Sequence, residues 1–247
     1  MTPLRYVGTA GWNIPSIHRS RFPSGGSQLQ RYAARLNAAE INTSFYRPHA
    51  ITTYERWAAV VPRSFRFAIK VPRIITHDRA LVRVRDPLTR FLEEISGLGE
   101  KTGPLLVQLP PSFAFDARHV GRFFELLRKR HDGAVVCEPR HETWTAVAAT
   151  KLLASFRIAR VAADPPRVAG LHEPGGWTGI AYYRWHGSPR TYFSPYPPDA
   201  LRALAMRLTS HDVDAWCIFD NTAHNWATPN ALDLRDQITA SQGRLTT

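Results

Sequence analysis

Charged and amide residues stand at the ends of short apolar runs along the whole chain. Glu138 ends a run that begins at Ala134, and His186 ends one that begins at Ala181. Carboxylates and imidazoles accept and donate protons in enzymes. A buried charge is costly unless it is paired or used, so this pattern favours a site of proton transfer. The candidate catalytic residues are Glu138, His186, Asp164 and Glu40.

Cations stand in equivalent positions, and aromatic or amide residues lie close to them in the sequence. Such cations would bind a phosphate or carboxylate and stabilise developing negative charge, while aromatic rings stack on planar or sugar-like groups. The structural alternative is a charge-balanced network, in which four carboxylates face three cations and only stabilise the fold. The candidate binding residues are Lys70, Arg184, Arg140, Asn42, Gln108, Asp220, Asn221, Trp12, Tyr46, His141 and Trp144.

Metal-binding spacings such as His-x-x-x-His or Cys-x-x-Cys do not occur in the sequence. A metal site would have to be assembled by the fold, and its oxygen-rich ligands would suit Mg²⁺ or Mn²⁺. Lys70 and Arg184 would repel such an ion. We therefore expect no cofactor, and a divalent metal is the less favoured alternative, held by His186 with Glu138, Asp164 or Asp220.

The apolar runs are short and rich in β-branched and aromatic residues, which is typical of buried strands. Most segments between them carry apolar residues at spacings of three and four, as amphipathic helices do. In one such segment, we expect Asp86 at the N-cap and Pro87 in the first turn. The predicted strands are 5–9, 39–42, 65–71, 105–109, 134–139, 159–164, 181–186 and 215–220. The predicted helices are 27–37, 87–97, 116–130, 143–154, 199–208 and 229–238.

Strands that alternate with helices imply parallel pairing and right-handed crossovers. Eight such units in 247 residues match the usual size of an α/β fold of the (β/α)8 TIM-barrel class. The sixth crossover, 165–179, is rich in Pro and Gly, and we expect its helix to be short or missing. No shift of composition marks a boundary, so a single domain over residues 1–247 is predicted. In this fold the polar strand ends meet at one end of the barrel.

The chain is strongly basic, with a net charge of +12 and 28 Arg against 4 Lys. This balance favours an anionic partner, either a small phosphorylated compound or a nucleic acid. The alternative is an even scatter of Arg over a solvated surface, because no long run of basic residues occurs. The best candidate for a phosphate-attracting loop is 72–86, which carries Arg73, His77, Arg79, Arg83 and Arg85.

Other features of the sequence indicate a cytoplasmic protein without a membrane partner. No apolar run reaches about 18 residues, which a membrane-spanning helix would need. The N-terminal residues lack the pattern of a signal peptide. Cys137 and Cys217 each lie inside an apolar run, so we expect two reduced core thiols rather than a disulfide.

A series of short motifs follows in order through nearly the whole chain. They are GTAGW at 8–12, EINTSFY at 40–46, FRFAIK at 65–70, QLPP at 108–111, EPRH at 138–141, YRWHG at 183–187 and FDNT at 219–222. With these motifs the sequence resembles the YecE-like family, known as domain of unknown function 72. The resemblance implies a barrel fold and supplies no reaction. The chain departs from the family at Asp220, where the family often has Asn, and at 13–18, where the family has an aromatic-rich stretch.

Three classes of function are consistent with these patterns. The favoured class is an enzyme that acts on a small anionic or sugar-like substrate by acid–base chemistry at the C-terminal end of the barrel. The second is a nucleic-acid-binding or processing protein with a basic, aromatic-rich rim. The third is a non-catalytic barrel that binds a ligand. Clustering of Arg in one stripe would favour nucleic acid, whereas a closed pocket would favour a small ligand.

Overall fold

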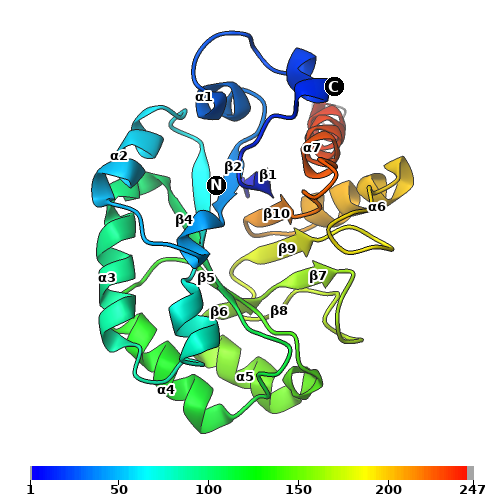
Figure 1. The fold of residues 1–247 in the computed structure, drawn as a ribbon. Coiled ribbons are helices and arrows are strands. Elements are labelled where there is room, and N and C mark those ends of the chain that lie inside the picture. The colour runs from blue at the N-terminus through cyan, green and yellow to red at the C-terminus, as the bar shows by residue number, and fades with distance from the viewer. Residues whose placement is uncertain (1, 244–247) are drawn as a thin grey trace.

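Parallel strands form the centre of the molecule, and helices surround them (Figure 1). The structure, a computed structural model, describes residues 2–243, with side chains through residue 240. The strand order is β7-β9-β10-β1-β2-β3-β4-β5-β6-β8, and only β8 pairs in the antiparallel direction. The strands are β1 Arg5–Ala10, β2 Ala38–Ile41, β3 Arg66–Lys70, β4 Thr102–Gln108, β5 Val135–Glu138, β6 Ile158–Arg160, β7 Ala162–Asp164, β8 Gly175–Gly176, β9 Ala181–Trp185 and β10 Ala215–Phe219.

The sixth predicted strand is divided into β6 and β7, and this division nearly closes the sheet into a barrel. The first part, β6, pairs with β5, and the second part, β7, pairs with β9. Only Val161 separates them, and its backbone N–H donates to the carbonyl of Cys137 at 2.8 Å. The predicted TIM-barrel architecture is therefore confirmed.

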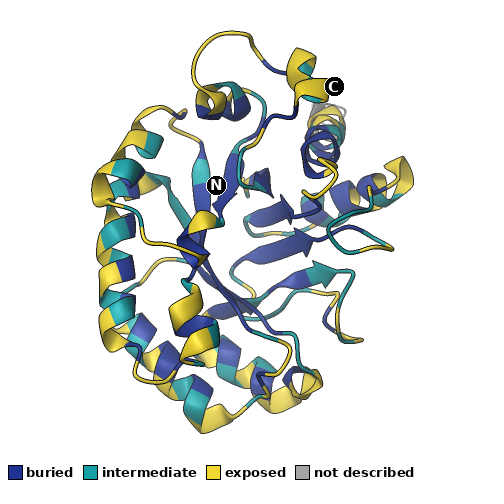
Figure 2. Ribbon diagram, viewed as in Figure 1, coloured by how far each residue is buried: buried dark blue, intermediate teal, exposed yellow. Residues whose placement is uncertain are grey.

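The helices lie outside the barrel, with their apolar faces toward it (Figure 2). The predicted helices are present, but the sequence analysis did not assign α2, although its apolar residues Ile51, Tyr54 and Trp57 follow a helical spacing. The α-helices are α1 Gln28–Ala33, α2 Ile51–Ala59, α3 Arg85–Ile95, α4 Ala117–Arg128, α5 Val147–Ser155, α6 Pro198–Thr209 and α7 Ala227–Gly243. The short turns are η1 Ser16–Arg21, η2 Thr43–Phe45, η3 Ile74–Asp78, η4 Ser96–Lys101 and η5 Glu142–Thr145.

Two local expectations about the connections have different outcomes. The crossover 165–179 contains only β8 and no helix, as predicted. The prediction of Asp86 as an N-cap is wrong, because α3 already begins at Arg85 and Val84 occupies the cap without a side-chain hydrogen bond. Asp86 instead lies in the first turn of α3, where its negative charge interacts favourably with the positive, N-terminal end of the helix dipole.

Apolar residues fill the barrel interior and lead directly to a polar layer. The inward-facing apolar side chains of successive strands include Ala38, Ala68, Leu106, Val136, Tyr182 and Ile218. Side chains two positions apart on a strand lie on the same face of a sheet. The next inward positions, toward the C-terminal ends, therefore hold Glu40, Lys70, Gln108, Glu138, Arg184 and Asp220.

Aromatic rings close the N-terminal end of the barrel. Tyr6 and Trp216 are stacked with ring centroids 4.3 Å apart, and Tyr182 lies 6.1 Å from Trp216 farther inside. Gly103 makes room for this packing, because a Cβ atom there would stand 2.6 Å from the Trp216 ring. Apolar packing thus fills the barrel below the polar layer.

Cys137 and Cys217 are buried free thiols, as predicted from their apolar surroundings, and burial raises the pKa of both. Within residues 2–243, no helix has the length and apolar character that crossing a membrane requires.

Candidate active site at the C-terminal end of the barrel

The guanidinium of Arg184, on β9, lies at the centre of the polar layer and is fully buried. Its Nε and Nη2 atoms donate to the two carboxylate oxygens of Glu40 at 3.0 and 2.8 Å. Nη2 also lies 2.9 Å from Oδ2 of Asp220, and Nη1 donates to Oε2 of Glu138 at 3.3 Å. Burial lowers the pKa of Arg184, but the three carboxylates outweigh it and raise that pKa well above its usual range.

Glu138, at the end of β5, accepts hydrogen bonds from several side chains. Arg140 donates to Oε1 through Nε at 2.9 Å and Nη2 at 2.8 Å, and Gln108 donates to Oε2 at 2.9 Å. Burial alone would raise the pKa of Glu138, but the charges of Arg140, Arg184 and His186 outweigh it and hold that pKa well below its usual range. Glu138 is therefore ionised at neutral pH.

His186 lies between two carboxylates just after β9. Its Nδ1 is 3.1 Å from Oδ2 of Asp220, and its Nε2 is 3.3 Å from Oε1 of Glu138, without the geometry of a hydrogen bond. Burial lowers the pKa of His186, but the nearby charge of Glu138 and the hydrogen bond to Asp220 outweigh it, so the pKa is raised above its ordinary value. The imidazole therefore holds a proton more firmly than a free histidine does.

Lys70, at the end of β3, differs from the other buried cations. It is 6% exposed, and its Nζ lies 4.2 Å above the ring of Phe45. Among the described residues, no carboxylate oxygen lies within 4.0 Å of Nζ. Burial and the charge of Arg184 lower the pKa of Lys70 to about 8, although Glu40, Glu138 and Asp220 act in the opposite direction.

Two loop residues lie next to Lys70 and His186, and of these only His77 belongs to a loop that the sequence indicates as a binding element. The ring of His77 packs edge-on against Phe45 at 5.0 Å, and burial and the charges of Lys70, Arg73 and Arg140 lower its pKa. The ring of Tyr192 lies edge-on to His186 at 5.7 Å. The first contact joins loops that are distant in the sequence, whereas the second lies within the single loop after β9 and depends on how that loop folds.

The space above the cluster is narrow. A cavity of about 20 Å³ is lined by Glu138, Arg140, His186, Tyr192 and parts of the loop after β7. That volume accommodates about one water molecule. Several buried polar atoms at this end have no hydrogen-bond partner within the described part of the chain, and they include Oδ1 of Asn42, Nε2 of His186 and Oδ1 of Asn221. Buried polar atoms without a hydrogen-bond partner indicate a place where water or a ligand binds.

Asp164 does not join the cluster, so the expectation that it lies with the other strand ends is wrong. Its Oδ1 accepts a hydrogen bond from the Tyr196 hydroxyl at 2.8 Å. The inward-facing residues of this segment are Ala159 and Val161, whereas Ala162 faces the helices. Asp164 is an even number of residues from Ala162 and shares its outward direction.

The predicted aromatic and loop residues are mostly engaged in packing. Trp12 packs against Trp57 of α2, at 5.0 Å between ring centroids, on the outside of the barrel. Trp144 is fully buried and donates from Nε1 to the carbonyl of Phe113 at 3.0 Å. His141 accepts from the backbone N–H of Thr143 and caps η5. These three residues have structural contacts that explain their positions.

Two further predicted residues differ in accessibility. Asn221 is buried, and its Nδ2 donates to the carbonyl of Ser194 at 3.0 Å and to Oδ1 of Asn230 at 2.9 Å, which fixes the loop after β9. Tyr46 is 72% exposed and lines a groove of about 600 Å³ between the loops after β2 and β3. Tyr46 is therefore the predicted aromatic residue that a ligand can reach most easily.

The basic loop 72–86 is curled and exposed. Arg79, Arg83 and Arg85 point to the surface, and Arg73 forms an ion pair with Asp78 at 3.0 Å. Three residues of this loop have a positive φ, which brings the chain back on itself between η3 and α3. Of the basic residues in this loop, His77 is the one whose ring contacts Phe45 beside Lys70.

The alternative of a metal site has an electrostatic difficulty. Arg184 occupies the position between the carboxylates that a cation would need. In the region with described side chains, no group of three or more His, Cys, Asp or Glu has a metal-binding arrangement.

The family model described as "Protein of unknown function DUF72" matches residues 6–247. The chain belongs to the DUF72 family. This finding confirms the resemblance that the sequence motifs indicate.

Two curated relatives of this DUF72 protein have partial matches. The UPF0759 protein YecE of Escherichia coli (strain K12) is 33% identical over 108 residues, which is 44% of this chain and 38% of YecE. The UPF0759 protein YunF of Bacillus subtilis (strain 168) is 24% identical over 153 residues, which is 56% of this chain and 51% of YunF. The chain thus matches about half or less of the length of these relatives.

Solved structures of the family show the same fold. A DUF72 family protein from Enterococcus faecalis has a TM-score of 0.80 at 18% identity and covers 96% of both chains. Another from Thermotoga maritima has a TM-score of 0.76 at 23% identity, over 96% of this chain and 99% of that one. At these identities the likeness establishes the barrel fold alone.

Proposed function

We propose that this DUF72 protein is an enzyme that binds a small anionic substrate at the C-terminal end of the barrel. The anionic group, a phosphate or a carboxylate, is bound by Lys70, with Arg140 and His77 beside it. His186 donates a proton to the substrate. Glu138 and Asp220 stay ionised and hold the imidazole in place.

The observation that carries this proposal is the state of Lys70. Arg184 and Arg140 are paired with carboxylates, but the Lys70 amine is buried without a carboxylate within 4.0 Å among the described residues. Burying an unpaired charge is costly. An anion next to Nζ would offset that cost, so the positive charge at this site favours binding of a negatively charged ligand. Barrel enzymes place their substrates at this same end.

The proton chemistry is supported by the two opposed pKa shifts. The pKa of His186 is raised, and the pKa of Lys70 is lowered to about 8. The lowered pKa brings Lys70 closer to neutral pH than a free lysine, and the raised pKa of His186 favours the protonated imidazole that can donate a proton. Glu138, with its strongly lowered pKa, is a poor proton donor at neutral pH and acts as the charged partner of His186.

A thermal-shift experiment with inorganic phosphate and sulfate tests the anion site. The melting temperature of the wild type should rise with added anion, because a ligand that binds only the folded state stabilises it. Lys70→Met removes the amine and keeps most of the side chain's volume, so its melting temperature should rise much less. Lys151→Met, an exposed lysine on α5, is the matched control and should respond like the wild type.

The outcomes separate the alternatives. Equal shifts in all three proteins would show general salt stabilisation and would remove the basis for the site. If Lys70→Met alone loses the response, screening of phosphorylated and carboxylated metabolites for turnover follows, with His186→Gln as the variant expected to bind the substrate and lose activity.

Nucleic-acid binding is the second candidate, and the groove at Tyr46 favours it. Arg47, Arg73 and Arg90 line this groove beside the exposed ring. However, Asp78, Asp86 and Glu94 line the same groove and would repel phosphates. Binding of a single-stranded oligonucleotide that weakens steeply with salt, and is lost in Tyr46→Ala, would favour this function over the small-molecule enzyme.

A further inference from the structure

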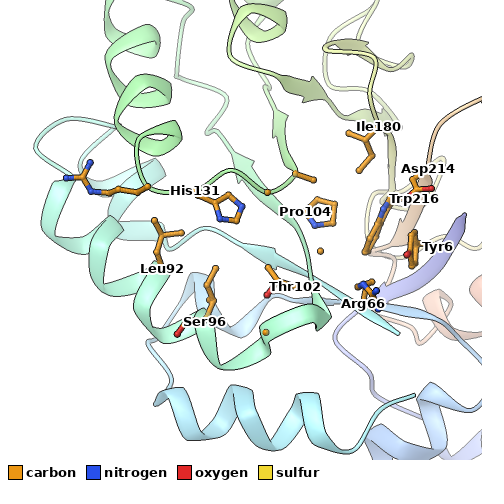
Figure 3. A pocket seen from close by; sticks show the side chains of 16 residues that line it. Tyr6, Arg66, Leu92, Ser96, Thr102, Pro104, His131, Ile180, Asp214 and Trp216 are labelled. Atoms are coloured by element: carbon orange, nitrogen blue, oxygen red, sulfur yellow. The ribbon is translucent and has the colours of Figure 1, made fainter. Parts of the chain in front are cut away.

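The proposed function requires a route by which a substrate reaches His186. At the N-terminal end of the barrel, Tyr6 and Trp216 line a cavity of about 470 Å³ (Figure 3). Their rings are stacked with centroids 4.3 Å apart, the two residues are only 5% and 3% exposed, and Tyr182 lies behind Trp216. Apolar packing blocks this end, so access to His186 must come from the C-terminal end.

Two loops close the C-terminal end over His186. Thr191 and Tyr192, from the loop after β9, line the cavity of about 20 Å³ beside the imidazole, together with Arg167 and Leu171 from the loop after β7. This space holds about one water molecule, so it has no room for a phosphate or a carboxylate group. At least one of the two loops must therefore move before a substrate can bind.

The loop after β9, residues 187–196, is fixed at its two ends. The backbone N–H of Gly187 donates to the hydroxyl of Tyr196 at 2.9 Å, and Nδ2 of Asn221 donates to the carbonyl of Ser194 at 3.0 Å. Gly187 has a φ of +97°, and a Cβ atom there would lie 2.7 Å from the carbonyl oxygen of Ser194. The two ends of the loop are thus held close together.

The tip of the loop has few contacts by comparison. Among the described residues, only Tyr192 connects the backbone of residues 188–193 to residues outside the loop. Its N–H donates to the carbonyl of His186, and its carbonyl accepts from the N–H of Ala223 at 3.2 Å. The ring of Phe193 adds an edge-on contact with His224 at 5.0 Å. A segment with so few buried contacts opens at a low cost in free energy.

Tyr192 has a backbone conformation that is rare for an aromatic residue. Its φ of +71° lies in the left-handed region, where the Cβ atom crowds the backbone. In this conformation the ring lies edge-on to His186, with centroids 5.7 Å apart. Strained residues of this kind cluster at ligand-binding segments and switches. Opening of the loop would release the strain.

The hydroxyl of Tyr192 is available to a ligand. It has no hydrogen-bond partner within the described part of the chain. Arg140 and His186 line the same small cavity as Tyr192. A phenolic hydroxyl can donate a hydrogen bond to an anion that lies beside these two groups.

We propose that Tyr192 is a substrate-contacting residue carried on a gating loop, residues 188–193. In the closed loop its ring covers His186, and the loop opens to admit an anion. When the loop closes again, the hydroxyl of Tyr192 donates a hydrogen bond to that anion. The contact with the anion rests on the proposed function, whereas the covering of His186 does not.

Modification of histidines by diethyl pyrocarbonate, mapped by mass spectrometry, measures access to His186. Tyr192→Gly removes the ring and suits a positive φ, so the backbone of the loop should keep its conformation. His186 should react about tenfold faster or more in this variant, because the reagent reaches a covered imidazole only from the open state. Tyr192→Phe keeps the ring and should protect His186 as the wild type does.

A second residue with a positive φ provides the matched control. Asn225, in the loop after β10, is exposed and has a φ of +64°. Asn225→Gly should leave the modification rate of His186 unchanged. His172 is exposed and serves as the internal reference, since it should react equally in every variant. Melting curves confirm that each variant is folded.

Inorganic phosphate tests the contact with the hydroxyl. Phosphate should slow the modification of His186 in the wild type, because the anion occupies the space beside the imidazole. In Tyr192→Phe, which lacks the hydroxyl, the same protection should need about tenfold more phosphate, since one hydrogen bond to a charged group is lost.

Two results would overturn this inference. Equal modification rates of His186 in the wild type and Tyr192→Gly would show that the ring does not cover the imidazole. Equal protection by phosphate in the wild type and Tyr192→Phe would show that the hydroxyl does not contact the anion. Either result leaves the proposed function standing if phosphate protects the wild type. Fast modification in Tyr192→Gly without any protection by phosphate would contradict the proposed function and support the covering role of Tyr192.

Discussion

Glu138 shows how strongly single residues of the cluster depend on one another. Its carboxylate neutralises Arg140, shares Arg184 with two other acids and raises the pKa of His186. A buried cation that loses its partner is destabilising by about 3–5 kcal/mol. The structural role of Glu138 and the role proposed for it as the charged partner of His186 are therefore two effects of the same charge.

Glu138→Gln should lower the free energy of unfolding by on the order of 3 kcal/mol at pH 7, because Arg140 loses its carboxylate. The pKa of His186 should fall in the same variant, since Glu138 is the largest influence that raises it. Chemical denaturation measures the first effect, and NMR titration of the histidine ring measures the second. Glu142→Gln, an exposed neighbour, is the control, and an unchanged His186 pKa in Glu138→Gln would contradict this account.

Lys70 should make stability depend on pH in the alkaline range. Below pH 8 the amine is charged in both the folded and the unfolded state, and its burial disfavours folding. Between about pH 8 and 10.5 the folded protein releases this proton first, so stability should rise with pH by about 3 kcal/mol in total. Urea unfolding of the wild type and of Lys70→Met across this range measures the difference, because other groups titrate equally in both. Parallel pH profiles would show that Lys70 has an ordinary pKa in the folded state.

At the scale of elements, the barrel depends on close contact between neighbouring strands. Gly8 lies in β1, and a Cβ atom there would stand 2.0 Å from the carbonyl oxygen of Ala38 in β2. Backbone atoms cannot move aside cheaply, so Gly8→Ala should destabilise the fold by about 3 kcal/mol or more. Gly25→Ala is the control, since nothing lies within 4 Å of its Cβ position. Thermal unfolding compares the two, and similar melting temperatures would mean that β1 and β2 separate easily.

Strand positions could be predicted from the sequence because the barrel strands are short runs of β-branched and aromatic residues. Alternation within those runs placed Glu40, Lys70 and Glu138 together, since side chains two residues apart share a face. The same rule applied to the sixth strand would have placed Asp164 outward, because Ala159 faces inward. The sequence alone does not show which residue of this run faces inward, because the run is divided between β6 and β7.

Partner choice and loop packing could not be predicted in this way. Spacing does not reveal that Arg184 would pair with Glu40 across 144 residues, or that Lys70 would lie on Phe45. Trp144 follows β5 in the sequence, but its ring turns into the core because the carbonyl of Phe113 accepts its N–H there. These contacts depend on how separate loops meet, and no local pattern encodes them.

At the scale of the whole molecule, the free thiols report on global unfolding. Cys137 and Cys217 lie on β5 and β10, both fully buried. A thiol reagent should therefore modify neither in the native protein and both in denaturant. Rapid modification under native conditions would mean that the barrel opens locally at one of these strands. Titration with a chromogenic disulfide, with and without guanidinium, makes the measurement.

The position of Arg184 in the chain has a consequence for synthesis on the ribosome. Glu40 emerges early, and the side chain with which it forms an ion pair in the structure follows 144 residues later. Until β9 has left the exit tunnel, a half-formed barrel would have to bury this carboxylate without a counter-charge, which is strongly unfavourable. The nascent chain therefore gains little by closing early, and β10, which must still pair with β1, emerges later again. Closure of the barrel should thus wait until β10 has left the exit tunnel, and truncated products that lack β9 and β10 should remain open to proteases.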